Sequence, residues 1–379
     1  MLVVSPMSDA FIPSSPPSPR PSQRLLSLDA FRGATIAFMV LVNNAGDGAH
    51  IYTPLEHAQW HGWTLTDVVF PSFLWIVGVA ITLSLAKRVA AGASRAALFR
   101  QVLRRAAVIY ALGLLVYLFP EFDFPHMRVL GVLQRIAICY LAASAIYLTT
   151  SIRGQIAWIA SLLGSYWLLM TLVPVPGFGA GRLDVEGNFA HYADSLVLGA
   201  HNYAHTRTWD PEGLVSTLPA LATALLGIMA GHILRLKKHL AERTVWLFVA
   251  GNLLLAAGLV CDTWLPINKK LWTSSFALFM GGLDFVLFAL SIWLVDHLGA
   301  RRWTRPFTIL GMNAIAVYMA AEIFASLLDA LGWQKRMFAA VFAPIASPNN
   351  ASLLYALSFT LLMFGFAWLL HRRGWYLRV

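Results

Sequence analysis

The stretch TLTDVVFPSFLWIVGVAITLSLA, residues 64–86, is the segment that decides the fold. Its only ionisable side chain is Asp67, close to its start. About 20 residues are enough to cross the hydrocarbon core of a bilayer as a helix, because each residue adds about 1.5 Å of rise. We therefore predict a membrane-spanning helix over these residues.

Comparable apolar stretches lie on both sides of this segment, at 30–46, 103–120, 129–149, 155–174, 214–234, 244–264, 272–295, 306–330 and 352–371. Of the 379 residues, 58% are hydrophobic and only 12% are charged. A soluble protein could not cover so much apolar surface with so few charges. The expected fold class is all-α, a polytopic integral membrane helical bundle with about ten transmembrane helices and the lipid bilayer as its solvent.

The distribution of Lys and Arg predicts the orientation of the bundle. The net charge is +10, but the basic residues gather in short connections, so we expect no nucleic-acid partner. Of the 28 basic residues, 20 lie in the tail and first-helix entry, 87–105, 150–154, 235–243, 299–305 and 372–379. Seven lie in the alternate connections. Because cytoplasmic connections carry the excess, both termini are predicted to be cytoplasmic and the 175–213 connection to face outside.

The N-terminal residues differ from the rest in composition. Residues 1–23 are rich in Pro and Ser and have no long apolar stretch before a cleavage site, so we predict a disordered cytoplasmic tail. Cys139 and Cys261 are the only cysteines, which offers no disulfide framework. His201 and His205 are four apart but lack a third ligand at a recognisable spacing, so no metal site is expected.

Polar side chains inside apolar runs need a partner or a polar cavity. In RLLSLDAFRG, residues 24–33, Asp29 and Arg32 share one helix face. They form either an ion pair at the helix start or, in the case of Arg32, a contact to a phosphate-bearing cofactor. Asn43 and Asn44 end the same apolar run and are followed by Glu56, His57, Trp60 and His61. His57 is therefore either an interfacial residue or a functional one among polar and aromatic groups.

Further candidates lie at the predicted outer ends of later helices. Gln134 and Arg135, within RVLGVLQRIAICYL, either form interhelical hydrogen bonds or line a substrate cavity. Asp210 and Glu212 lead into a helix within WDPEGLVSTLPA. Lys269, within PINKKLWTSS, is an outside cation that breaks the charge bias, which favours binding or pairing with a carboxylate. No Walker A sequence, dinucleotide fingerprint, nucleophile elbow or HExxH motif is present.

In order along the chain, RLLSLDAFRG, LVNNAG, EHAQWHGWTLTDVVFP, GVLQRIAICYL, WDPEGLVSTLPA and PINKKLWTSS resemble the heparan-α-glucosaminide N-acetyltransferase family within the transmembrane acyltransferase group. The resemblance covers most of residues 24–379, expected to form one transmembrane acyltransferase domain, with the Pro/Ser-rich tail in place of the luminal domain of the lysosomal enzyme. It implies transfer of an acetyl group from cytosolic acetyl-CoA to the amine of a glucosamine unit across the membrane. For a bacterial-type relative, the expected location is the inner membrane.

The resemblance also assigns roles to residues. His57 matches the active histidine, and Asn43, with Asn44 as its neighbour, matches the catalytic asparagine. An imidazole suits removal of the amine proton, and an amide suits donation to a thioester oxyanion. We expect the CoA phosphates near Arg32, Arg104 and Arg105. We expect the acceptor near Trp60, Asp67, Gln134, Arg135, Asp210, Glu212 and Lys269.

Two other classes of function stay open at this point. A sugar transporter or permease without acyl transfer would also need cavities lined by Asn, Gln, Arg and Trp. A non-catalytic membrane scaffold is the third interpretation. A homodimer is compatible with the sequence, but no pattern in it specifies one.

Overall fold

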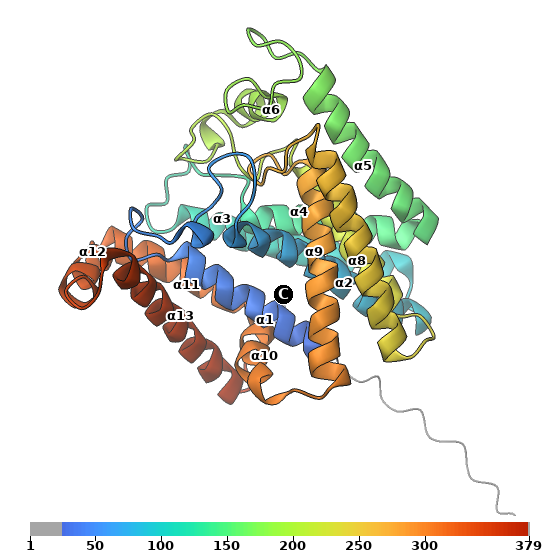
Figure 1. The fold of residues 1–379 in the computed structure, drawn as a ribbon. Helices are drawn as coiled ribbons and strands as arrows, with labels where there is room; N and C mark the ends of the chain where they lie inside the picture. The colour runs from blue at the N-terminus through green and yellow to red at the C-terminus, as the bar shows by residue number, and fades with distance from the viewer. Residues whose placement is uncertain (1–24, 378–379) are drawn as a thin grey trace, which may run out of the picture.

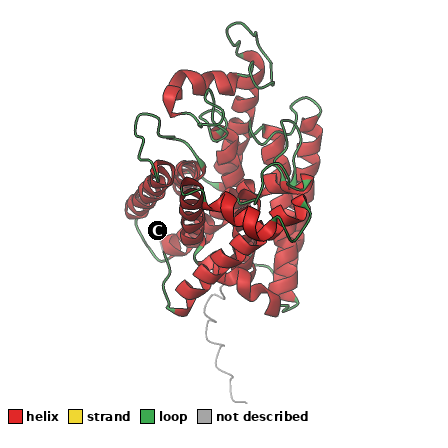
Figure 2. Ribbon diagram, turned by 90° about the vertical axis from the view of Figure 1, so that its left-hand side faces the viewer, coloured by secondary structure: helices red, strands yellow, loops and turns green. Residues whose placement is uncertain are grey.

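The computed structural model describes residues 25–377, and these residues form a helical bundle without strands (Figures 1 and 2). Within them, nine helices are long and apolar enough to span a membrane. These are α1 (Leu26–Asn43), α2 (Leu65–Ala90), α3 (Arg95–Leu118), α4 (Val132–Thr149), α5 (Ile152–Leu172), α7 (Thr217–Leu234), α8 (Leu240–Asp262), α9 (Ser274–Ile292) continued by the π-helical turn η3 (Trp293–His297), and α13 (Pro348–Arg372). The predicted all-α membrane bundle is confirmed.

The tenth predicted span is broken. The 3₁₀ turn η4 (Arg302–Thr304) and α10 (Arg305–Met312) meet α11 (Ala314–Ala330) at an angle of 72°. Asn313 occupies the break with non-helical backbone angles. Its side chain donates to the Trp375 carbonyl oxygen and accepts from the Leu377 amide, both at 3.1 Å. These two bonds hold the break against the residues that follow α13.

Short elements that the hydropathy pattern did not predict lie in the connections. These are α6 (Phe189–Leu198), α12 (Trp333–Met337), the 3₁₀ turns η1 (Thr53–Leu55) and η2 (Gly199–His201), and the π-helical turn η5 (Phe338–Phe342). The segment 87–105 was predicted to be a connection, which is wrong for most of it, because only residues 91–94 connect α2 to α3. Ser94 caps α3 by accepting a hydrogen bond from Ala97 N, so Arg104 and Arg105 lie inside that helix.

Helices α2 and α7 approach each other more closely than side chains would allow. A Cβ on Gly78 would lie 1.9 Å from the Ala224 carbonyl oxygen, and one on Gly227 would lie 1.9 Å from the Trp75 carbonyl oxygen. Small residues at helix crossings permit this close packing in membranes, where apolar burial against lipid contributes little. The close contact with α7 therefore fixes the position of α2, whose first turn contains Asp67.

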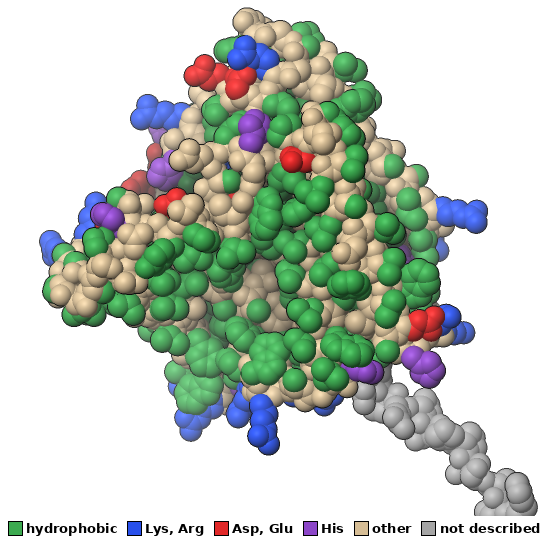
Figure 3. All heavy atoms as spheres, in the orientation of Figure 1, with side chains coloured by type: hydrophobic (Ala, Val, Ile, Leu, Met, Phe, Trp, Pro, Cys, Tyr) green, Lys and Arg blue, Asp and Glu red, His purple; other side chains and the backbone are tan. Residues whose placement is uncertain are grey.

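Alternate connections gather at the same end of the bundle. The loops 44–64, 119–131, 173–216, 263–273 and 331–347 contact one another at what we call the site end. At the opposite end, Ser27 N donates to Asp296 Oδ2 at 3.3 Å, and His232 Nε2 lies 2.8 Å from Gln155 Oε1. Apolar side chains spread over the middle of the face in Figure 3, and Lys and Arg lie mainly at its margins. The count of Lys and Arg assumed that alternate connections lie at the same end of the bundle, as the loops of the site end do.

Candidate active site

His57 and Asp67 form the central pair of the site end. His57 Nδ1 lies 2.7 Å from Asp67 Oδ1. The Asp67 side chain is 1% exposed, whereas 45% of the His57 side chain is exposed. Because Nδ1 faces the carboxylate, Nε2 is left as the nitrogen that can accept a proton. An imidazole held in this way by a carboxylate is suited to general base catalysis.

The first turn of α2 places Asp67. Thr64 is the N-cap and Asp67 is the third helical residue, and the two form a reciprocal capping box. Asp67 Oδ2 accepts hydrogen bonds from the Ala58 and Thr64 amides, both at 3.0 Å. One carboxylate thus caps the helix, ties down the preceding loop and orients His57. Asp67 was predicted to bind the acceptor, and in the structure its carboxylate contacts the imidazole of His57.

The loop between α8 and α9 packs against the loop that carries His57. Gly62 N donates to the Ile267 carbonyl oxygen at 2.7 Å. The φ angle of Gly62 is +92°, a conformation that side chains other than glycine rarely adopt. Lys270 Nζ donates to the Gln59 carbonyl oxygen at 2.6 Å. These bonds join two loops that are some two hundred residues apart in the chain.

Lys269 lies directly on the His57 ring. Its Nζ atom is 3.3 Å from Nδ1 and 3.4 Å from Nε2 of His57, and 3.9 Å from Asp67 Oδ1. Burial lowers the pKa of Lys269 from its ordinary value, although the charges of Glu212 and Asp67 act in the opposite direction. Lys269, which was predicted to bind the acceptor, therefore lies beside His57, the candidate general base.

Asn43, the last residue of α1, lies on another wall of the site end. Its side-chain amide interacts with the carboxyl group of Glu322 in α11. Asn43 and Asn44 line a cavity of about 240 Å³ together with Ala325, Ser326, Asp329, Gln334 and Tyr355. Within residues 25–377, no hydrogen bond joins Asn43 to His57.

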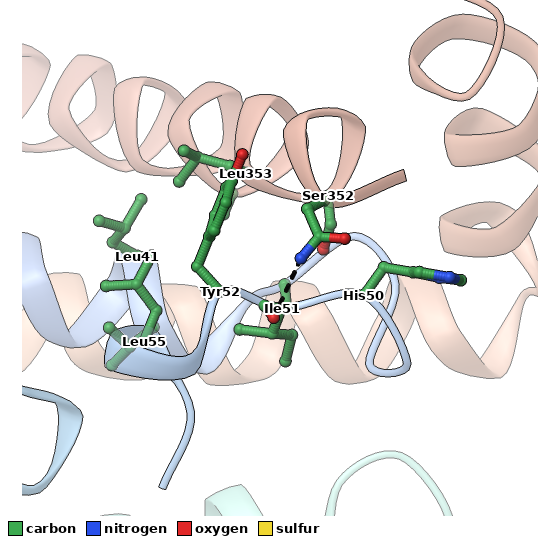
Figure 4. A pocket seen from close by; sticks show the side chains of 11 residues that line it. Leu41, His50, Ile51, Tyr52, Leu55, Ser352 and Leu353 are labelled. Atoms are coloured by element: carbon green, nitrogen blue, oxygen red, sulfur yellow. Dashed lines mark hydrogen bonds between the residues drawn. The ribbon is translucent and has the colours of Figure 1, made fainter. Parts of the chain in front are cut away.

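The chain between Asn43 and His57 is held by the start of α13. Asn349 Nδ2 donates to the Ile51 carbonyl oxygen at 3.2 Å, the bond drawn in Figure 4. Tyr52 donates its hydroxyl proton to Asn350 Oδ1 at 2.8 Å. In Figure 4, the side chains of this loop, the end of α1 and the first turn of α13 lie against one another. The two predicted catalytic residues are therefore connected by an anchored loop.

Asp210 and Glu212 are both bound by Arg128. The guanidinium group forms a two-pronged contact to Asp210 at 2.7 and 2.5 Å and also donates to Glu212. It lies 4.4 Å above the ring of Tyr203. Burial raises the pKa of Asp210, and Arg128 opposes this. Asp210 and Glu212, which were predicted to bind the acceptor, therefore both form buried ion pairs with Arg128.

Gln134 and Arg135 lie at the start of α4, fully buried. Arg135 Nη2 donates to the Gly213 carbonyl oxygen at 3.1 Å and to the Ser216 hydroxyl, and its guanidinium lies 5.2 Å from the centre of the Trp272 ring. These contacts support the interhelical packing role, which the sequence left open. The amide of Gln134 has no hydrogen-bond partner among the described residues.

Trp60 joins the His57 loop to the long 173–216 connection. Its Nε1 donates to the Leu183 carbonyl oxygen at 2.8 Å. Its ring meets Trp209 edge to face at 6.1 Å, and Trp209 stacks on His191 at 4.0 Å. Burial lowers the pKa of His191 to about 4, so this ring is neutral at pH 7. Trp60 is therefore placed in a packed aromatic cluster, with one face left partly exposed.

The residues predicted to bind CoA lie away from His57. Arg32 Nη1 is 3.4 Å from Asp29 Oδ1 and 3.5 Å from the Gly311 carbonyl oxygen, which supports the ion-pair interpretation. Arg105 lies 5.1 Å from the centre of the Tyr140 ring, and Arg104 is exposed.

Two acids inside spans were missed by the sequence analysis. Glu322 lies in α11 beside Asn43, and Asp284 in α9 accepts a hydrogen bond from Ser72 at 2.5 Å while its other oxygen has no partner among the described residues. Both could have been identified from the sequence, because each is an isolated acid in a long apolar run, where an acid needs a partner or a polar cavity.

Comparison with known proteins gives one consistent family. A family model described as heparan-alpha-glucosaminide N-acetyltransferase, catalytic, matches residues 24–267. The chain is 31% identical over 356 residues to heparan-alpha-glucosaminide N-acetyltransferase of Homo sapiens, covering 79% of this chain and 53% of that protein. It is 29% identical over 357 residues to the Mus musculus protein of the same name, covering 80% of this chain and 54% of that protein. The chain therefore spans about half the length of these relatives.

The matched region includes α1, the His57 loop and the capping box of α2, so it contains the His57–Asp67 pair and Asn43. Together with the bundle of apolar helices, this match shows that the chain is a multi-pass membrane protein that belongs to the heparan-alpha-glucosaminide N-acetyltransferase family.

Proposed function

We propose that this protein transfers an acetyl group from acetyl-CoA to the amine of a glucosamine-type sugar. The observation that carries the proposal is the His57–Asp67 pair, with a buried carboxylate behind a half-exposed imidazole, in a chain of this family. The human and mouse relatives are named for acetylation of a glucosaminide amine. An amine attacks a thioester only as its free base, and a neutral imidazole can take the proton that the amine loses.

The proposed reaction is a direct transfer. The acceptor nitrogen bonds to the thioester carbonyl carbon, the C=O electron pair moves onto oxygen, and the amine proton passes to His57 Nε2. When the carbonyl re-forms, the C–S bond breaks and its electron pair leaves with sulfur, which then takes the proton from Nε2. Asp67 stabilises the imidazolium that exists between these two events.

The cavity beside Asn43 is our proposed place for the acceptor. Its volume of about 240 Å³ and its lining of amide, hydroxyl and carboxylate groups suit a polar sugar. Asp329 is the acid in this lining and supplies a charge complementary to an ammonium group. The amide of Asn43 would then donate to the oxygen of the tetrahedral intermediate.

For acetyl-CoA, we propose entry from the opposite end. Arg32, Arg104 and Arg105 would receive its phosphates there. This places the acetyl donor in the cytoplasm and the acceptor outside, with both termini cytoplasmic, as the 20-to-7 split of basic residues predicts. A bacterial inner membrane is the proposed location.

A sided vesicle assay tests the function and the orientation together. Purified protein is reconstituted into liposomes, orientation is determined by protease accessibility, acetyl-CoA is placed on one side and glucosamine on the other, and products are identified by mass spectrometry. We expect N-acetylglucosamine only when acetyl-CoA is on the side of the termini. Glucosamine that crosses unmodified, at a rate independent of acetyl-CoA, would support the sugar permease instead.

In the same assay, Asn43→Ala should lower turnover by roughly ten- to a thousandfold, because one donor to the oxyanion is lost. Binding of acetyl-CoA should change little. Asn44→Ala is the matched control, because the Asn44 amide is already bound to the Val40 carbonyl oxygen at 2.8 Å. If Asn44→Ala abolishes turnover and Asn43→Ala does not, the catalytic role belongs to Asn44.

A further inference from the structure

The ammonium group of Lys269 lies over the face of the His57 ring. Its nearly equal distances of 3.3 and 3.4 Å to the two ring nitrogens leave no other position, because an equidistant atom in the ring plane would collide with Cε1. The in-plane lone pair of Nε2 is therefore open to a substrate amine. Any carbonyl carbon attacked by an amine at Nε2 comes within reach of the flexible lysine side chain.

Neighbouring residues hold Lys269 in this position. Asn268 is fully buried, with its backbone N–H donating to Thr273 Oγ1 at 3.1 Å and its side-chain Oδ1 accepting from Leu271 N at 2.9 Å. On the other side, Lys270 is held by its bond to the Gln59 carbonyl oxygen. The two consecutive lysines therefore have different partners: Lys269 contacts the imidazole of His57, and Lys270 binds the backbone of the loop.

Lys269 shares its nearest carboxylate among the described residues, that of Asp67, with His57. Only 17% of its side chain is exposed, and the only carboxylate within 4.0 Å among residues 25–377 is Asp67, at 3.9 Å. Asp67 already accepts from His57 through Oδ1 and from two amides through Oδ2. The nearby Glu212 is bound by Arg128.

Such an arrangement does not favour stability. A largely buried cation costs free energy when its counter-ion lies 3.9 Å away and is already bound by His57 and two amides. Burial lowers the pKa of Lys269, because the charged ammonium group is less stable in this position than in water. The cost is reduced when a negative charge forms next to it, and the proposed reaction forms one at the thioester oxygen.

We infer that Lys269 is a catalytic residue whose ammonium group stabilises the oxyanion formed when the acceptor amine attacks the thioester carbonyl. The inference rests on the proposed acetyl transfer. The oxyanion would lie against the Lys269 ammonium group, on the side of the His57 ring where the amine attacks. Lys269 keeps its proton throughout, and the amine proton goes to His57 and then to the leaving thiolate.

Lys269→Met is the first test, because methionine keeps the length of the side chain and removes the charge. We expect kcat to fall by about a hundred- to a thousandfold, with KM for acetyl-CoA and for glucosamine within about threefold of the wild-type values. An interaction made only in the transition state lowers kcat and kcat/KM equally. Lys238→Met is the matched control and should keep kcat within about threefold, because Lys238 is half-exposed and pairs with Glu242 at 2.8 Å, away from the site end.

Lys269→Arg provides a readout that a purely structural role would not change. Guanidinium stays protonated at any pH the protein tolerates, whereas the ammonium of Lys269 loses its proton below the usual range of lysine. The wild-type kcat should therefore decline at alkaline pH, and this decline should be absent in Lys269→Arg. The melting temperature of each variant in detergent, measured alongside, shows that the fold is retained.

Three results overturn the inference. They are a kcat of Lys269→Met within threefold of wild type, a loss confined to KM, or an equal loss in Lys238→Met. In each of these cases wild-type protein still transfers acetyl groups and the proposed function stands. Wild-type protein that transfers none overturns the proposed function and this inference with it.

Discussion

His57→Ala should abolish acetyl transfer while leaving acetyl-CoA binding intact. The variant removes the only group at the centre of the site that is positioned to take the amine proton, and Asp67 then has no imidazole to orient. Transfer is measured in the sided vesicles and binding by equilibrium dialysis with labelled acetyl-CoA. Turnover above about one per cent of wild type in His57→Ala would show that another group acts as base.

His50→Ala is a matched control in the same loop. His50 also pairs with an acid, with its Nδ1 2.7 Å from Asp47 Oδ2. Both members of that pair are exposed to solvent, with 46% and 35% of their side chains accessible. Transfer by His50→Ala should stay close to the wild-type rate, so that loss in His57→Ala is attributed to position and not to the removal of any histidine.

His57→Ala also distinguishes direct transfer from an acetyl-histidine intermediate. Radiolabelled acetyl-CoA is added without acceptor, and free CoA and protein-bound label are both counted. We expect no stoichiometric label, because an acetyl-imidazole on a half-exposed ring would be hydrolysed. Label on wild-type protein that is absent from His57→Ala and removed by glucosamine would establish the covalent route.

Hydropathy predicted the spans because length and composition decide whether a helix crosses a bilayer. It could not reveal the break at Asn313, since the residues on both sides are apolar and the bend depends on bonds to Trp375 and Leu377. It also missed α6 and α12, because short helices in connections leave no long apolar run. The early start of α3 was hidden by basic residues that we interpreted as a connection.

The candidate site was predictable in its members more than in its geometry. His57 was selected by motif resemblance and Asp67 as an acid inside an apolar run. Their pairing depends on the turn in which Asp67 accepts from the Ala58 and Thr64 backbone amides. Lys269 reaches His57 across 212 positions, a contact that no local pattern can specify. Asp210 and Glu212 were assigned to the acceptor because the partner that binds them, Arg128, is far away in sequence.

Asp67→Asn is expected to have the second largest effect, a loss of kcat of about 10²- to 10⁴-fold. Asparagine has the same shape, and its oxygen can still accept from the Ala58 and Thr64 amides. Its NH₂ group then faces His57 Nδ1 and donates to it, which moves the imidazole proton to Nε2. An Nε2 that carries a proton cannot accept one from the amine, so the fold is kept while the base is lost.

Thr64→Val separates this tautomer effect from helix capping. Valine removes the Thr64 hydroxyl, which bonds to Asp67 at 3.2 Å and to the Glu56 carbonyl oxygen at 2.5 Å. It keeps the backbone amide of residue 64, which bonds to Asp67 Oδ2 at 3.0 Å, so we expect the His57–Asp67 contact to remain. Loss of a cap costs roughly 1 kcal/mol of stability, so Thr64→Val should lower the melting temperature at least as much as Asp67→Asn while keeping kcat within about threefold. Nuclear magnetic resonance of ¹⁵N-histidine protein would report the tautomer directly. A His57 that keeps its proton on Nδ1 in Asp67→Asn, or an Asp67→Asn enzyme as active as wild type, would show that Asp67 only holds the loop and that the imidazole is oriented by other contacts.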